Sequence, residues 1–142
     1  MKKSNMSSDN RSSYQDEWER SPGYVYFIGA GDPVKAVKIG VTKQKGIIQM
    51  LRHHQTSNHE PLRILAVIPF EATERPMLKA EEKEKELRTK FAHLQRFKSG
   101  WIGSEWFTVS DDLLAEIDKI GIKPKELGIK DSVIIPGPGL DR

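Results

Sequence analysis

The chain of 142 residues contains no cysteine, which excludes a disulfide framework and any zinc site built on thiolates. It also fits a reducing compartment. No apolar run approaches the roughly 20 residues that a membrane-spanning helix needs, so we expect no membrane partner. The first residues are basic, but no hydrophobic segment follows them, which is untypical of a signal peptide. These absences predict a soluble cytoplasmic protein.

The chain also has little net charge, because 23 Lys and Arg residues are nearly balanced by 20 Asp and Glu residues, which leaves a net charge of +3. This small excess only weakly indicates nucleic-acid binding. Length and composition predict one folded domain over residues 23–120. Residues 1–22 are rich in Ser, Asn and mixed charge and are expected to form a flexible arm. Residues 121–142 are expected to form a Pro/Gly-rich tail, in which the apolar stretch 133–135 would dock on the domain.

Two short apolar segments, 23–28 and 37–42, predict the strands of an antiparallel hairpin, with Gly, Asp and Pro in the turn between them. Because side chains alternate along a strand, both tyrosines of the first segment share one face. Lys38 and Gly40 of the second segment take the face opposite to its three apolar residues. The hairpin therefore sets the phenol of Tyr26 and an amine side by side.

The rest of the sequence predicts an α+β fold with a small three-stranded antiparallel sheet flanked by helices. The expected elements are a helix over 44–55, a third strand over 62–68, a long helix from Pro76 to about residue 95, a short strand over 105–109 and a helix over 111–119. Thr42 is a candidate N-cap for the first of these helices, and Ser110 for the last.

An acidic residue interrupts the apolar stripe of the long helix. The stripe consists of Met77, Ala80, Glu84, Leu87, Phe91 and Leu94. A carboxylate in such a place needs a hydrogen-bond donor, a cation or a metal ion, because its desolvation is costly. The sequence offers Arg88 one turn later, Lys38 across the sheet, or a metal as the partner of Glu84.

Basic side chains gather in two places and suit contacts with phosphates, although solvated surface lysines are common. One group lies in or beside the first predicted helix, and the other follows Arg88 in a stretch without acids. The candidate nucleic-acid-binding residues are Lys43, Lys45, Arg52, Arg96 and Lys98. Aromatic residues interleave with the second group and could stack on bases, but Phe91 fits the core better.

Five short motifs occur in one order: residues 25–26, 38–42 and 55–58, Glu84 before Leu87 and Phe91, and residues 105–107. In this order the chain resembles the GIY-YIG nuclease superfamily over about residues 23–110, and most closely the phage and bacterial branch whose second motif is Lys-Ile-Gly. The resemblance implies a three-stranded antiparallel sheet flanked by helices. It also implies cleavage of DNA phosphodiesters with one divalent ion, Mg²⁺ or Mn²⁺, and no small-molecule cofactor.

The resemblance gives roles to three residues. It makes Tyr26 the general base for the attacking water, Lys38 the group that positions or polarises this water, and Glu84 the metal ligand. Phosphodiester cleavage builds negative charge on the phosphorus oxygens, which a metal and a nearby cation stabilise. A tyrosine with an ordinary pKa of about 10 also loses its proton more easily beside an ammonium group.

Two positions depart from the family pattern. The family places an arginine four residues before a histidine, and counting back from His54 gives Met50, with Arg52 as the nearest guanidinium. Arg88 stands where this branch commonly has histidine. It would either hold the scissile phosphate or neutralise Glu84 and replace the metal. Arg52, His54 and Arg88 therefore join Tyr26 and Lys38 as candidate catalytic residues.

Three hypotheses follow from the sequence. The first is a metal-dependent DNA endonuclease, and the second is a catalytically impaired nucleic-acid-binding relative. The third is a small interaction domain in which the motifs are structural, because fold alone does not establish function.

Overall fold

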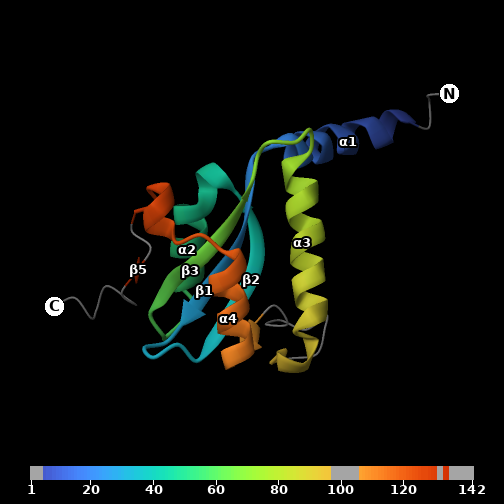
Figure 1. Ribbon diagram of the computed structural model, residues 1–142. Helices are drawn as coiled ribbons and strands as arrows, with labels where there is room; N and C mark the ends of the chain where they lie inside the picture. The colour runs from blue at the N-terminus through green and yellow to red at the C-terminus, as the bar shows by residue number, and fades with distance from the viewer. Residues whose placement is uncertain (1–4, 97–105, 131–132, 135–142) are drawn as a thin grey trace.

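The computed structural model describes residues 5–96, 106–130 and 133–134 and shows an α+β fold, with one sheet between helices on both of its faces (Figure 1). The predicted α+β class is confirmed. Lys98 and the predicted strand position 105 lie outside the described residues.

Five strands form one antiparallel sheet in the order β4-β2-β1-β3-β5. Their bounds are Gly23–Ala30 (β1), Ala36–Lys43 (β2), Leu62–Phe70 (β3), Trp106–Thr108 (β4) and Val133–Ile134 (β5). The prediction of a three-stranded sheet is wrong, because β4 and β5 add an outer strand on each side. Both are short, and two or three residues carry little periodicity from which a pairing can be predicted.

The helices are Asn5–Arg20 (α1), Ile47–Gln55 (α2), Pro76–Lys90 (α3) and Asp111–Ile120 (α4), with 3₁₀ turns at Gln44–Gly46 (η1), Ala92–Leu94 (η2) and Pro124–Leu127 (η3). Helices α2 and α4 lie close to their predicted bounds, and α3 begins at Pro76 as predicted but ends before the predicted residue 95. Ser110 caps α4 as predicted, since its hydroxyl accepts a hydrogen bond from the Leu113 amide at 3.1 Å. The predicted Thr42 cap is wrong, because η1 precedes α2 and the Thr42 hydroxyl donates to the Lys43 carbonyl.

Strand β1 is the central strand, and all eight of its residues are buried. The predicted alternation is confirmed, because Val25 and Phe27 enter one apolar core while Tyr24, Tyr26 and Ile28 enter another. Helices α3 and α4 pack on the first face through Ala80, Leu87, Phe91, Leu113 and Ile117, and α2 packs on the second through Ile47 and Leu51. We call these the α3 face and the α2 face.

Strand β2 has an open edge over part of its length. Strand β4 pairs with β2 only at Ala36–Lys38. Among the described residues, positions 39–43 of β2 pair with β1 alone. We call this stretch the open edge of β2, because no described strand pairs with its outer side.

Helix α1 replaces the flexible arm that the sequence predicts for residues 1–22. It crosses the N-terminal end of α3 and extends away from the sheet (Figure 1). The Arg75 guanidinium, just before α3, pairs with the carboxylates of Asp16 and Glu19, each at 2.7 Å. The Trp18 indole donates to Glu81 on α3 at 2.9 Å. Sequence composition misses this helix because its partners lie more than 50 residues away.

The predicted tail contributes to the far edge of the sheet. The backbone of Ile122 exchanges two hydrogen bonds with Val67 of β3, and β5 pairs with Leu62 and Arg63. No helix among the described residues is long and apolar enough to cross a membrane.

Candidate active site

The ring of Tyr26 lies on the α2 face over Gly40, its partner on β2. A Cβ atom at Gly40 would overlap the phenol oxygen, so this close approach needs glycine. Tyr26 is only 4% exposed. The hairpin therefore holds the phenol by packing, against the backbone of the strand that carries Lys38.

Lys38 is buried on the same face, two positions before Gly40. A buried ammonium needs polar partners, and Lys38 Nζ lies 3.2 Å from His54 Nε2 on α2. For a charged Lys38 to donate, Nε2 must be the acceptor and Nδ1 must carry the ring proton. Tyr26 and Lys38 occupy diagonal positions of the β1–β2 pair, within reach of long side chains. The structure thus places Tyr26 and Lys38 on one face of the sheet and brings His54 into contact with Lys38.

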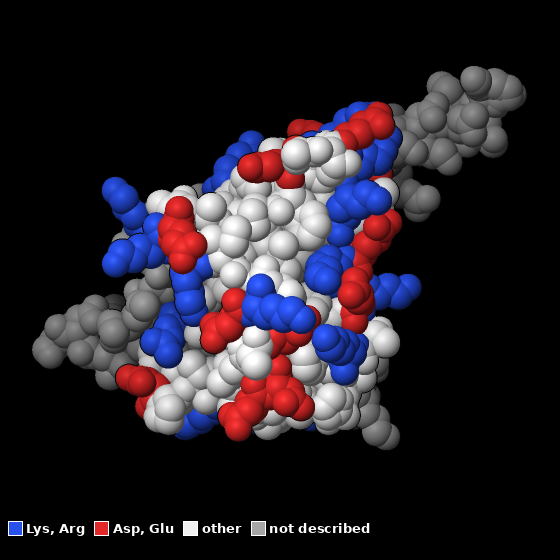
Figure 2. All heavy atoms as spheres, in the orientation of Figure 1, with Lys and Arg blue, Asp and Glu red and all other residues white. Residues whose placement is uncertain are grey.

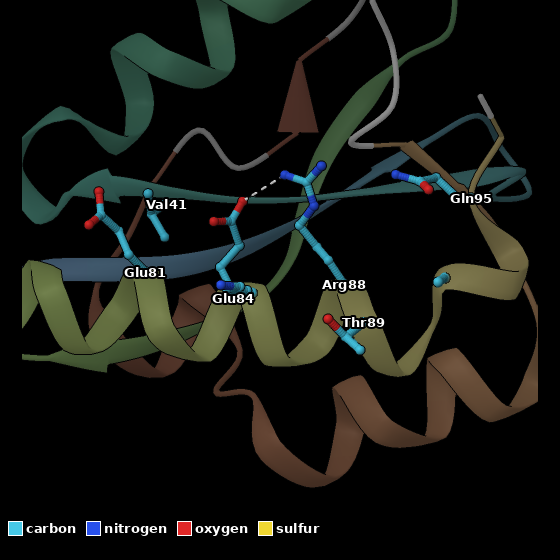
Figure 3. Close-up of a pocket in the computed structure, with 8 residues that line it drawn as sticks. Val41, Glu81, Glu84, Arg88, Thr89 and Gln95 are labelled. Atoms are coloured by element: carbon cyan, nitrogen blue, oxygen red, sulfur yellow. Dashed lines mark hydrogen bonds and ion pairs between the residues drawn. The ribbon is translucent and has the colours of Figure 1, made fainter. Parts of the chain in front are cut away.

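Glu84 lies on the other side of β2, in a pocket of about 560 Å³ between α3 and the open edge (Figure 3). Its side chain is 19% exposed, and its Oε2 atom accepts from Arg88 Nη1 at 3.2 Å. Both side chains point from α3 toward β2, where Val41 lines the same pocket (Figure 3). Arg88 is therefore one partner of Glu84, and it is one of the three partners that the sequence offers.

A second carboxylate, Glu81, lines the pocket one helical turn before Glu84. It accepts the hydrogen bond from Trp18, which connects α1 to the rim of the pocket. The sequence does not single out Glu81, because it looks like one of several acids on a solvated helix face.

The predicted residues form two sets on the two sides of the sheet. Tyr26 and Lys38 belong to the α2 face, whereas Glu84 and Arg88 project from the helix that covers the α3 face. The open edge of β2 borders both sets, since its Gly40 lies under the Tyr26 ring and its Val41 lines the pocket of Glu84 and Arg88. A substrate group that contacts both sets has to lie along this edge.

The carboxylates of the pocket fit a magnesium ion chemically. Mg²⁺ usually keeps several water ligands and takes one or two carboxylates besides substrate phosphates, a requirement that Glu84 and Glu81 meet. No group of three or more His, Asp or Glu side chains among the described residues is arranged to enclose an ion. Glu84 would share its carboxylate between the ion and the guanidinium of Arg88.

The remaining basic candidates that the structure describes come from four different places in the fold. Lys43 ends β2 and Lys45 lies in η1, while Arg52 is exposed on α2 and Arg96 is exposed after η2. Met50 packs at the border of the α2-face core. On the face shown in Figure 2, Lys and Arg alternate with Asp and Glu. The charge pattern of this face alone therefore does not define a nucleic-acid interface.

Tyr24, the other tyrosine of β1, does not have the easily lost proton that a general base requires. Burial, and to a smaller extent the charge of Glu71, raises the pKa of the Tyr24 phenol above its ordinary value of 10. Tyr24 therefore keeps its proton at neutral pH, which makes it a natural control for Tyr26.

Sequence reasoning assigned no role to Gln55, yet it is one of two buried polar residues, with Lys38, among the described positions. Its Oε1 atom accepts from the Leu62 amide at 2.9 Å. Its Nε2 atom donates to the carbonyls of Asn58 and Glu60 at 3.2 and 3.0 Å. Gln55 thus fastens the α2–β3 loop to the start of β3. The only sequence signal is its place in the third motif.

Comparison of the chain with protein-family models, with curated proteins and with solved structures finds no match.

Proposed function

We propose that the chain is a GIY-YIG-type endonuclease that hydrolyses DNA phosphodiester bonds with one divalent ion, Mg²⁺ or Mn²⁺. The observation that carries this proposal is that the Tyr26 phenol, packed over Gly40, shares one face of the β1–β2 pair with the buried Lys38, whose Nζ atom lies 3.2 Å from His54 Nε2. Burying an ammonium is costly, and a purely structural site would be as stable with an apolar residue.

In this proposal the scissile phosphate lies along the open edge of β2, in contact with both sets of side chains. The oxygen of a water molecule forms the new bond to phosphorus, and its proton passes to the deprotonated Tyr26 phenol. The bond from phosphorus to the leaving sugar oxygen then breaks, and this oxygen takes a proton from solvent. Lys38 stabilises the phenolate and the attacking water, and His54 orients the Lys38 ammonium.

The α3 side of the site handles the charge of the phosphate. A divalent ion held by Glu84 would supply Lewis-acid stabilisation of the phosphorus oxygens. Arg88, at 3.2 Å from Glu84, donates to a second phosphate oxygen from the same side. Lys43, Lys45 and Arg52 contact neighbouring phosphates and fix the position of the DNA, without reading its sequence.

A second function is favoured by one specific observation, the ion pair between Arg88 and Glu84. If the guanidinium replaces the metal, the chain binds DNA without cleaving it. Met50, at the position of the family arginine, points the same way. This alternative is a catalytically impaired DNA-binding protein.

The test is cleavage of supercoiled plasmid and of labelled branched and linear DNA with Mg²⁺ or Mn²⁺. The native chain is compared with Glu84→Gln, which keeps the shape of the side chain and removes its charge. Glu86→Gln is the matched control, because Glu86 lies on the same helix, 66% exposed, and pairs only loosely with Lys83 at 3.4 Å.

The proposal expects metal-dependent cutting by the native chain and by Glu86→Gln, and a loss of at least about 100-fold in Glu84→Gln. Cutting that is unchanged in Glu84→Gln would contradict the role of this residue. Salt-dependent DNA binding without cutting in any variant would establish the impaired alternative.

A further inference from the structure

A second pocket, of about 260 Å³, lies near the β1–β2 turn. Its lining includes Ala30 and Ala36, which pair across the hairpin and are both buried. Paired residues share a face of the sheet, and Ala30 belongs to the α2-face core. Two methyl groups in adjacent positions leave a depression where longer side chains would fill the space.

Trp106 is the aromatic residue that lines this pocket. Trp106 is half-buried and packs at the border of the α2-face core. In the sheet it lies directly opposite Lys38, so the two side chains project from neighbouring positions on the same face. One residue of the pocket lining is therefore the direct neighbour of Lys38, which the proposed function places at the scissile phosphate.

A hydrogen-bonding side chain, that of Asn58, belongs to a residue that also lines the pocket. The Asn58 Oδ1 atom accepts from the Glu60 amide at 2.9 Å, which fixes the orientation of the side-chain amide. Its Nδ2 group has no acceptor among the residues that the structure describes. Because Gln55 anchors this loop, the donor is held in place before any ligand arrives.

Positive charge borders the same pocket. Arg96 contributes an exposed guanidinium that forms no ion pair within the described part of the chain. Lys35 also lines the pocket and pairs with Glu60 at 3.0 Å, an exposed pair of small strength that a phosphate can replace.

We propose that this pocket takes one unpaired nucleobase of the DNA strand, stacked on Trp106 and hydrogen-bonded by Asn58, with Arg96 on an adjacent phosphate. A flat aromatic wall, an oriented amide and a flanking cation are the groups by which proteins hold single bases. The volume lies below the range of about 300–1,000 Å³ that is typical of pockets for drug-sized ligands, which suits one base.

This inference rests on the proposed function and narrows its substrate class. A base enters such a pocket only when it is unstacked from its neighbours, and this costs least at mismatches, bulges, branches and single strands. The enzyme therefore recognises DNA structure, with the unpaired base held beside the phosphate that is cut.

The test measures binding alone, in EDTA, so that no strand is cut. Affinity for a fluorescein-labelled single strand is measured by anisotropy, and a single abasic position is then moved stepwise along the strand. The variants are Trp106→Leu, which keeps an apolar side chain without a flat ring, and Trp106→Phe, which keeps a ring. Circular dichroism and thermal unfolding confirm that each variant is folded.

We expect one abasic position to weaken binding by the native chain about tenfold or more, the usual magnitude of base stacking. Trp106→Leu should bind the intact strand about as weakly as the native chain binds the abasic strand, and the abasic position should not weaken its binding further. Trp106→Phe should bind the intact strand within about threefold of the native affinity. An abasic scan without any minimum, or native affinity in Trp106→Leu, would overturn the pocket. Competition by a free deoxynucleoside monophosphate at micromolar concentration would also overturn its assignment to a DNA strand.

Failure of the pocket and failure of the nuclease are distinguishable. If the chain binds DNA with these signatures but does not cleave it in Mg²⁺, the base-binding pocket is supported and the nuclease proposal is contradicted. If the chain cleaves DNA but every abasic position has the same effect on binding, the nuclease proposal is supported and the pocket is contradicted.

Discussion

The two faces of the sheet bury side chains of different chemical character. The α3 face buries aliphatic and aromatic side chains against α3 and α4, and its acidic group, Glu84, stays at the margin. The α2 face buries a comparable set, but it also encloses Lys38 and Gln55, and it packs the phenol of Tyr26 against bare backbone at Gly40.

Under the proposed function, this difference assigns folding stability mainly to the α3 face and catalysis mainly to the α2 face. An apolar face supplies the free energy of folding, whereas buried polar groups give little net stability even when they are fully hydrogen-bonded. We therefore expect substitutions on the α3 face to change mainly the free energy of unfolding. Substitutions of polar groups on the α2 face should change mainly the rate of DNA cleavage.

The largest effect is expected on the α3 face. Leu87→Ala removes a side chain that is 1% exposed, and it should lower the free energy of unfolding by about 2–5 kcal/mol. Urea denaturation measures this loss. The cleavage rate per folded molecule should stay close to native, and a large drop in that rate would blur the distinction between the faces.

The opposite result is expected for Lys38→Met, which replaces the buried ammonium by an apolar side chain of similar length. The free energy of unfolding should stay the same or rise. The single-turnover rate of cleavage should fall about 100- to 1,000-fold, since a preorganised cation is lost. A strongly destabilised but fully active variant would reverse our interpretation of this face.

Gln55 is expected to behave as a structural exception on the α2 face. Gln55→Ala leaves the Leu62 amide and two loop carbonyls without their partner, which should cost about 1–3 kcal/mol of unfolding free energy. Hydrogen exchange should show faster opening of residues 56–61. Equal protection of this loop in the variant and the native chain would remove the anchoring role.

A single methyl group tests the position of the Tyr26 phenol. Gly40→Ala forces the ring to move and should lower the cleavage rate about tenfold, with an overpacking cost of about 1–3 kcal/mol. Gly46→Ala is the matched control, because its nearest neighbour would be the Thr42 hydroxyl at an ordinary 3.8 Å. Similar rates in both variants would mean that the phenol position is unimportant.

The smallest effect concerns α1, which lies outside both faces. Hydrogen bonds from Arg75 and then Arg20 hold the pKa of Asp16 below its ordinary value of 3.8. A lowered pKa means that the folded state binds the proton less well, so the stabilisation is present above about pH 4 and is lost as the pH falls through the lowered value. Docking of α1, followed by Trp18 fluorescence, should weaken at acid pH, and Asp16→Asn should remove this part of the dependence.

The sequence predicts elements whose signals are local. Alternation gives the faces of β1, proline gives the start of α3, and a serine with acids behind it gives the start of α4. It predicts a short strand at β4, but not the pairing of β4 or β5 with the sheet or the docking of α1, because short pairings and distant ion pairs leave no periodicity.

The features of the candidate site also divide into those that the sequence predicts and those that it cannot predict. Spacing predicts that Tyr26 and Lys38 share a face and that Glu84 lies on an apolar stripe with Arg88 in reach. It cannot show that α2 brings His54 onto Lys38, or that Trp106 lies opposite Lys38, because both depend on how separate elements pack.

The most direct test of the account compares the two tyrosines of β1. Tyr26→Phe and Tyr24→Phe each remove one hydroxyl and keep the packed ring, and single-turnover cleavage of branched DNA in Mg²⁺ is measured for both and for the native chain. We predict a fall of about 100-fold or more for Tyr26→Phe, which loses the proposed general base. The rate should be close to native for Tyr24→Phe, whose phenol keeps its proton. Equal rates in all three proteins would contradict the assignment of catalysis to the α2 face.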